Sequence, residues 1–246
     1  RILIEDLRYQ PHIGINLEVM DPATVIYAGH RCNLLGMDVS DFGHMVGYAM
    51  ELCERGILSE KQIGRSLNWG DSEGMLSLLE DIAYRRGFGD VLADGPYCLK
   101  RLPPEAARYL DLIRNSTVGA IGGKVVKSYI FGQAVATIAG HAHRSRPGID
   151  VLQLPEDFLE KFYGGPVASD YKSYQGKARM VWWHELLFAV CDAIGFCRFQ
   201  TAFTTPHAPN WDEYSKFIYL ATGLNLPVAE LKEIAERIYT MERLLL

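Results

Sequence analysis

The sequence lacks three features that would point to common classes of protein: a long hydrophobic run, an excess of basic residues and a close pair of cysteines. No apolar stretch reaches the ~18 residues that a membrane-spanning helix needs, so a membrane partner is not expected. With 30 acidic and 25 basic side chains, the formal net charge is −5. Nucleic acids and anionic membrane surfaces attract basic protein faces, so neither is expected as a partner.

The cysteines have neither the number nor the spacing of a disulfide framework. They are Cys32, Cys53, Cys98, Cys191 and Cys197. Because the number is odd and no CxxC pair occurs, a disulfide-stapled fold, a zinc ribbon and a thioredoxin-like site are not expected in these residues. Free cysteines are usually small core residues, and reduced cysteines are typical of the cytoplasm. We therefore predict a cytoplasmic protein.

Strand patterns are also scarce, and most of the periodicity is helical. The 246 residues, of which 48% are apolar and 22% charged, suffice for one large domain or two ordinary ones. Glycines and polar residues gather between Asn115 and Gly123, which makes this segment the best candidate for a domain boundary. We predict a mainly α fold of two helical domains, residues 1–116 and 117–246, with little or no sheet.

Capping residues and apolar periodicity predict where individual helices lie. Asp21-Pro22 combines an N-cap side chain with a proline at the first helical position, and that helix should end at Gly36. A second helix has its buried stripe between Val46 and Cys53, at three- and four-residue spacing. The stripes of two later helices are Met75, Leu78, Leu79 and Ile82, with an end at Gly87, and Leu231, Ile234, Ile238, Met241 and Leu245.

Three further segments are less uniform. Pro103-Pro104 predicts a helix that lasts to about Arg114. The apolar residues from Val125 to Gly140 follow no regular spacing, so this segment is expected to be either a strand or a buried helix. Trp182 to Gln200 begins as a strongly apolar helix that delivers a carboxylate, a glycine and a thiol within six residues.

Two hexapeptides share one pattern. Asn33 to Asp38 (NLLGMD) and Asp192 to Cys197 (DAIGFC) each contain a polar residue, two others, a glycine, a large apolar residue and then Asp or Cys. Glycine lets a backbone approach a flat ligand closely, and a carboxylate accepts N–H groups with charge-assisted strength. Two copies suit a bulky ligand that is gripped from both sides. On spacing alone, Asp192 and Cys197 could equally be a helix-terminal residue and a buried thiol.

Four stretches occur in the order typical of one enzyme family. They are residues 32–38 (CNLLGMD), 49–58 (AMELCERGIL), 83–95 (AYRRGFGDVLADG) and 183–199 (WHELLFAVCDAIGFCRF). With them, the chain resembles domains 2 and 3 of the tungsten-containing aldehyde:ferredoxin oxidoreductases. The resemblance implies that residues 1–116 correspond to family domain 2, and residues 117–246 to a C-terminally truncated domain 3.

The resemblance also implies cofactors. In that family two pterin dithiolenes hold one tungsten, and a [4Fe–4S] cluster lies beside one pterin. The residues it assigns to the pterins are Asn33, Gly36, Met37 and Asp38 for one, and Asp192, Gly195 and Phe196 for the other. Cys197 would ligate the cluster, for which a thiolate is the natural ligand. The resemblance does not decide between tungsten and molybdenum as the metal.

Two of the departures from the family pattern concern the cofactor ligands. Asn33 stands where the family usually has aspartate, so that contact would be a neutral hydrogen bond. The other three cluster cysteines belong to a CxxCxxxC run that precedes these domains in the family. Since this sequence lacks the run, we expect it to be a segment of a longer protein.

The family's histidine near the metal follows a glycine in the region from His141 to Arg146. The resemblance assigns it to His143, with His141 as the alternative. A histidine has the pKa range of a proton donor or acceptor near neutral pH. Arg144 and Arg146 could bind a phosphate or an anionic substrate through forked hydrogen bonds, or could be solvated surface charges, and no role is assigned to them.

The implied activity is oxidation of a small aldehyde to a carboxylic acid, with electrons passing through the cluster to ferredoxin or a similar carrier. A subunit of an aromatic acyl-CoA reductase of the same family is one alternative. A helical scaffold without catalysis is another, and a metal analysis discriminates between it and an enzyme. The substrate within its class and the oligomeric state, including a homo-oligomer, are not readable from the sequence.

Overall fold

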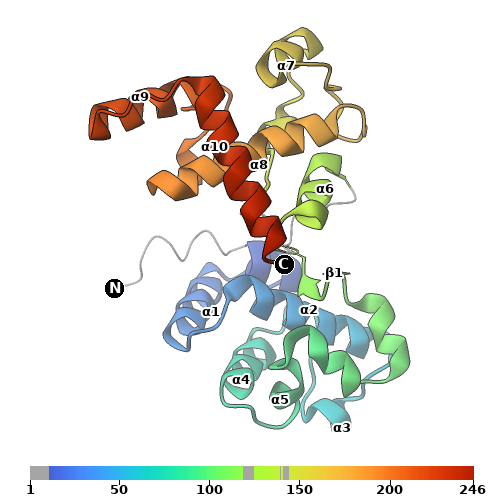
Figure 1. The fold of residues 1–246 in the computed structure, drawn as a ribbon. Helices are drawn as coiled ribbons and strands as arrows, with labels where there is room; N and C mark the ends of the chain where they lie inside the picture. Colours follow the sequence, from blue (N-terminus) through green and yellow to red (C-terminus); the bar gives the residue numbers. More distant parts are fainter. Residues whose placement is uncertain (1–10, 119–124, 139, 141–143) are drawn as a thin grey trace. The chain divides into compact units, whose positions relative to one another are not determined.

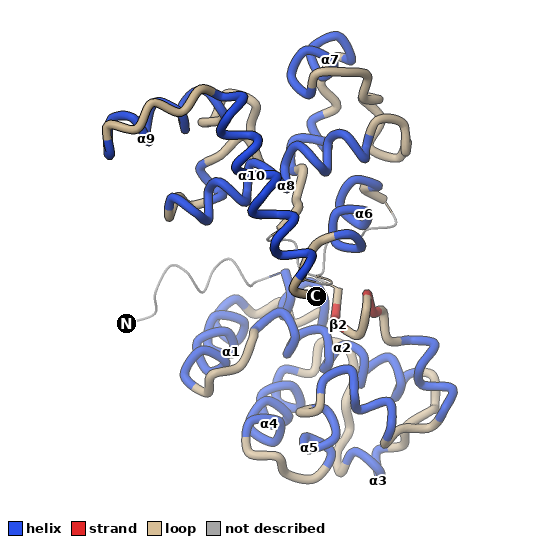
Figure 2. Tube along the Cα trace, in the orientation of Figure 1, coloured by secondary structure: helices blue, strands red, loops and turns tan. Residues whose placement is uncertain are grey.

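The computed structural model describes residues 11–118, 125–138, 140 and 144–246, which form two compact units, residues 1–121 and 122–246 (Figure 1). Each unit has its own hydrophobic core. Helices dominate the described residues, and the sheet among them has two short strands (Figure 2). The predicted mainly α class is therefore confirmed. Within these residues, no helix is both long and apolar enough to cross a bilayer.

The first unit is built around α2, a helix of sixteen residues in which ten are buried. Helices α1 and α4 pack against it, and α5 packs against α4. The elements are the π-helix η2 (Pro11–Ile15), α1 (Pro22–Leu34), α2 (Val39–Glu54), α3 (Glu60–Ile63), α4 (Ser72–Ala83), α5 (Phe88–Leu92), the 3-10 helices η3 (Gly95–Lys100) and η4 (Pro104–Tyr109), and the strands β1 (Leu112–Ile113) and β2 (Ser116–Thr117).

The helix starts of this unit follow from their capping residues. The Asp21 carboxylate accepts the Thr24 backbone N–H at 2.9 Å, with Pro22 at the first helical position. Asp71 caps α4 in the same way, through the backbone N–H of Gly74. Each such cap satisfies a backbone donor that has no partner inside its helix. The predicted stripe of α2 is confirmed as well, with Cys53 at its half-buried edge.

Two predictions in the first unit are wrong. The helix expected up to Arg114 ends as η4 at Tyr109, and an antiparallel hairpin follows in which Leu112 pairs with Thr117. Arg114 and Asn115 both have positive φ, of 47° and 62°, which is the backbone of a two-residue hairpin turn. Gly87 does not end α4, which stops at Ala83; it precedes α5 instead.

The second unit is organised around α8, the longest described helix (Figure 1). Helices α6, α7 and α10 pack on α8, and α9 packs on α10. The segment that was open between strand and helix contains a helix, α6. The elements are α6 (Lys127–Val135), η5 (Gly148–Leu152), α7 (Glu156–Tyr163), α8 (Lys177–Ile194), η6 (Arg198–Gln200), α9 (Trp211–Thr222) and α10 (Val228–Leu244).

The buried face of α10 differs from the predicted stripe. Leu231, Ala235 and Tyr239 are buried, whereas Met241 is 64% exposed and Leu245 85% exposed. The predicted stripe is therefore wrong for its last two members. The prediction left out Ala235 and Tyr239 because alanine and tyrosine were not counted as core residues. Alanine allows close contact between helices, and the Tyr239 hydroxyl has a buried partner on α8.

Candidate functional site

The two hexapeptides form the same local structure. At the end of α1, the Met37 N–H donates to the Cys32 carbonyl at 2.9 Å; at the end of α8, the Phe196 N–H donates to the Cys191 carbonyl at 2.8 Å. In each case the intervening glycine N–H reaches back three residues, to Asn33 or Asp192. This is the Schellman arrangement of a helix C-terminus. The shared sequence pattern therefore encodes a shared backbone shape.

Both motif glycines have left-handed backbones and open space beside them. Gly36 has φ +70° and Gly195 has φ +72°, a conformation that L side chains rarely adopt. No described atom lies within 4 Å of the place where a Cβ would stand on either glycine. A flat group can approach the backbone at both helix ends, so this geometry fits the pterin that the resemblance implies.

The first motif is exposed apart from its apolar residue. Asn33 and Asp38 are exposed, and Met37 is half-buried against the core of the first unit. Asp38 also caps α2, because its carboxylate accepts the Asp41 backbone N–H at 2.9 Å. One oxygen of Asp38 thus orders the next helix, and the motif joins the end of one helix directly to the start of another.

In the second motif, the Asp192 carboxylate is held by two arginines. Arg198 donates from Nε at 2.9 Å and from Nη2 at 2.5 Å to Oδ1, and from Nη2 to Oδ2 at 2.5 Å. Arg144 bonds to Oδ2 and also pairs with Glu242 of α10 at 3.1 Å. The Asp192 side chain is still 34% exposed, so a ligand N–H can reach it beside the two guanidinium groups. No role was predicted for Arg144, and Arg198 was missed because nothing in the sequence pairs it with Asp192.

The Phe196 ring packs against α9. Its centroid lies 5.4 Å from that of Tyr214 and 5.8 Å from that of Phe217, with the Phe217 ring nearly parallel. An apolar contact at this position commonly accompanies a Schellman helix end. Phe196 is half-buried. It ties the second motif to α9, and one ring face is already covered by Phe217.

Cys197 differs from the other four cysteines because its thiol is exposed. Burial raises the pKa of Cys32 to about 12 and that of Cys191 to about 11, which keeps both as neutral thiols. Cys53 and Cys98 likewise have pKa values raised to about 11 by burial. The interpretation of Cys197 as a buried thiol is therefore wrong. Its accessible sulfur has the chemistry of an iron ligand.

The described residues contain one part of a metal site at most. No group of three or more His, Cys, Asp or Glu side chains among them lies close enough together to hold a metal ion. His143 and His141 lie outside the described residues. The Arg146 guanidinium lies 5.7 Å from the Tyr129 ring centroid and 5.2 Å from the Phe203 ring centroid, so it packs against both aromatic rings.

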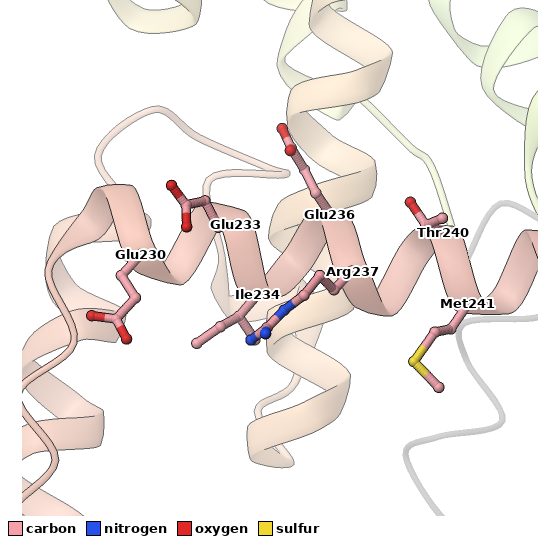
Figure 3. A pocket seen from close by; sticks show the side chains of 7 residues that line it. All are labelled: Glu230, Glu233, Ile234, Glu236, Arg237, Thr240 and Met241. Carbon is pink, nitrogen blue, oxygen red and sulfur yellow. The ribbon is translucent and has the colours of Figure 1, made fainter.

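Two hollows on the described surface of the second unit are lined by residues other than those of the motifs. One of about 620 Å³ is lined, as far as the structure describes, by α10 alone, including Glu233, Arg237 and Met241 (Figure 3). The other, of about 300 Å³, lies in the second unit among α6, α8 and α10. The motif residues lie instead at exposed helix ends.

The helical fold, the two matching helix ends and the exposed thiol agree with the family that the sequence resembles. This chain belongs to the aldehyde ferredoxin oxidoreductase family: residues 7–246 match the family model described as "Aldehyde ferredoxin oxidoreductase, domains 2 & 3". The resemblance predicted from the four sequence stretches is thereby confirmed.

Several curated proteins are similar to this chain. The tungsten-containing aldehyde ferredoxin oxidoreductases of Thermococcus kodakarensis and Pyrococcus furiosus are each 29% identical over 240 residues, covering 94% of this chain and 36% of the relative. A protein named "Aliphatic sulfonate oxidoreductase, WOR-like subunit", also from Pyrococcus furiosus, is 29% identical over 182 residues, covering 72% of this chain and 29% of the relative. The chain thus spans about a third of the length of these relatives.

One solved structure shares the fold. It is titled "Active site complex BamBC of Benzoyl Coenzyme A reductase in complex with 1,5 Dienoyl-CoA" and has a TM-score of 0.69 at 21% identity. The match covers 96% of this chain and 39% of that one.

Proposed function

We propose that this chain is the pterin-holding part of a tungsten oxidoreductase that converts aldehydes to carboxylic acids. In this proposal residues 1–116 and 117–246 are the family's domains 2 and 3. The observation that carries it is the pair of matching helix ends, each with an open left-handed glycine, one of which is followed by an exposed cysteine. The names of relatives that are 29% identical and contain tungsten support the choice of metal.

Each predicted residue has a role in the proposal. Gly36 and Gly195 let the backbone lie against a pterin. Asn33 and Asp38 at one end, and Asp192 at the other, would accept ring N–H groups. Met37 and Phe196, which also pack against their own cores, would pack on the pterin faces.

Cys197 supplies one thiolate to a [4Fe–4S] cluster, whose remaining ligands come from residues outside the described part of this chain. The bound metal would supply Lewis-acid polarisation of the substrate and two-electron redox chemistry. His143, with His141 as the alternative, would hold or move the proton. Electrons would leave the cluster to ferredoxin or a similar carrier.

Two arginines position Asp192 at the second motif. Its carboxylate forms ion pairs with Arg144 and Arg198, which hold it at the helix end. Asp192 would accept a pterin N–H, and Arg144 and Arg198 beside it would be donors to an anionic part of the ligand.

A second candidate substrate is an aliphatic sulfonate, because one relative carries that activity in its name. The likeness to the benzoyl-CoA reductase complex supports the fold alone, since the identity is 21%. An assay of the intact protein with a viologen dye separates the three substrates: aldehydes should reduce the dye, whereas sulfonates and aromatic acyl-CoA esters should not.

Metal content tests the proposal itself. The intact protein should contain tungsten or molybdenum and about four irons per chain. Cys197→Ser should remove or alter the cluster signal in electron paramagnetic resonance, whereas Cys53→Ser should leave it unchanged. Protein that is free of tungsten, molybdenum and iron would favour the scaffold. An unchanged signal in Cys197→Ser would instead refute the role of Cys197 as a cluster ligand.

A further inference from the structure

The smaller hollow lies inside the second unit, where α6, α8 and α10 meet. Its volume is about 300 Å³, which is at the lower end of the range for small-molecule sites. Its walls are mostly apolar and come from Phe131 and Val135 of α6 and from Ala178, Val181 and Trp182 of α8. The Trp182 ring stands edge-on to the Tyr239 ring, with centroids 5.4 Å apart. The size and walls suit one ring or a short branched chain.

A buried carboxyl group faces this hollow. Glu185 lines it, yet only 4% of the residue is exposed. Its Oε1 accepts the Tyr239 hydroxyl at 2.6 Å. Its other oxygen has no hydrogen bond to the described residues and is not among their fully buried side-chain atoms without a partner, so it is accessible from the hollow. A carboxyl group that is nearly buried, with one oxygen open to an apolar hollow, is the feature that points to a ligand.

A guanidinium group lies at the same hydroxyl. Arg243 donates from Nη1 to the Val135 carbonyl at 2.7 Å and to the Tyr239 hydroxyl at 3.4 Å. Its remaining nitrogens have no acceptor among the described side chains and backbone. Since Arg243 and Glu185 both reach one hydroxyl oxygen, a single small group in the hollow can contact both.

The charges around Glu185 decide which ligand fits. Burial raises the pKa of Glu185 to about 7, although the Tyr239 hydrogen bond and the Arg243 charge both lower it. Helix α6 contributes Phe131 and Val135, which are uncharged, and Arg243 is the charged group that α10 presents. With Glu185 neutral, the hollow offers an O–H donor and a cation, which together favour an anion with two acceptor oxygens.

We propose that this hollow is a binding site for a small carboxylate with an aromatic or branched aliphatic body. One carboxylate oxygen accepts the proton of the neutral Glu185 carboxyl, and the other pairs with Arg243. The body of the ligand packs on Phe131, Val181 and Trp182. The site is separate from both hexapeptide motifs, so it does not rest on the proposed function.

Benzoate is the probe, and calorimetric titration of the intact protein at pH 6 and pH 8.5 is the measurement. Benzoate remains ionised at both values, whereas protonated Glu185 becomes about tenfold scarcer for each pH unit above 7. The association constant should therefore fall about 30-fold between the two pH values. Benzylamine, a cation of the same size, should bind at least tenfold more weakly than benzoate at pH 6.

Two variants and a control assign the effect to these residues. Glu185→Gln keeps a donor that does not titrate, so benzoate should bind equally well at both pH values. Arg243→Leu should weaken binding at least fivefold at pH 6. Arg237→Leu is the control, because Arg237 lies on the same helix without lining this hollow, and its affinity should match that of the unaltered protein.

Three outcomes would overturn the proposal. They are the absence of benzoate binding at millimolar concentration, an affinity that does not change with pH, and tighter binding of benzylamine than of benzoate. Because the titration needs no tungsten or iron, these outcomes are independent of whether the protein oxidises aldehydes.

Discussion

Arg198 binds both oxygens of the Asp192 carboxylate, six residues before it in the chain. The helix ends between them: Asp192 belongs to the last turn of α8, Gly195 reverses the backbone, and Arg198 starts η6. The ion pair closes a loop in the chain that contains Gly195, Phe196 and the exposed Cys197. The second motif is therefore ordered by contacts within the chain, independently of any ligand.

The motif glycines should be required for both stability and cofactor content. Gly195→Ala forces an L side chain into a left-handed backbone and should destabilise the protein by about 1–2 kcal/mol, as should Gly36→Ala. The space beside each glycine is open, so backbone strain is the whole cost. Denaturant unfolding gives the free energy, and metal analysis gives the cofactor content.

Gly56→Ala is the matched control for the glycine variants. Gly56 also follows a helix, with φ +67° and open space beside it, but lies outside both motifs. It should show a similar loss of stability with full tungsten content. An equal loss of tungsten in all three variants would show that strain, rather than the motifs, controls cofactor retention.

Asp192→Asn should lower tungsten content far more than it lowers stability. The substitution weakens ion pairs at a partly exposed site, and such pairs contribute little to folding. Asp94→Asn is a fitting control, because Asp94 also bridges two arginines, Arg85 and Arg101, outside the motifs. Both variants should have nearly unchanged melting temperatures, and Asp192→Asn alone should lose metal. Full tungsten content in Asp192→Asn would contradict the assigned role.

Cys197 should be the most reactive cysteine in protein purified without iron. Alkylation requires an accessible thiolate, and Cys32 and Cys191 are buried with pKa values raised to about 12 and about 11. Brief treatment with iodoacetamide at pH 8, followed by peptide mass spectrometry, should label Cys197 first. Labelling of Cys191 at a similar rate would mean that the end of α8 opens readily.

Glu185 should make folding stability depend on pH. Its folded pKa of about 7 is above the ~4.3 of an unfolded chain, so between these values the folded state binds more protons. Stability should therefore fall as pH rises from about 4.3 to 7, by about 3–4 kcal/mol, and then level off. Glu185→Gln should remove this contribution.

His184 has the opposite effect on the pH dependence of stability, so its contribution must be separated from that of Glu185. Burial lowers the pKa of His184 to about 3, so stability falls as pH drops below about 6.5, the value of an unfolded histidine. The informative quantity is the difference in unfolding free energy between Glu185→Gln and the unaltered protein, in which the His184 contribution cancels. Relative to the unaltered protein, the variant should be more stable at pH 8 than at pH 5. An equal difference at the two pH values would show that Glu185 is ionised in the folded protein at both values.

Local signals predicted both ends of α1. Asp21-Pro22 and Gly36 act through atoms within a few residues of each other, and the structure places the start and the end of that helix where they were expected. The hairpin at Arg114-Asn115 was missed because a double proline suggested a longer helix. The face of α10 was misassigned because its inner residues include Tyr239, whose burial depends on a partner on another helix.

The sequence by itself determined the family, the helical class and the two matching helix ends, because each depends on the order of residues along a short stretch of chain. Only the tertiary structure decided which distant groups meet. It brings Arg144 to Asp192 across 48 residues and packs Phe196 on α9. It also buries Glu185 beside Tyr239 across 54 residues. These contacts depend on how helices far apart in the chain pack, and no spacing in the sequence specifies them.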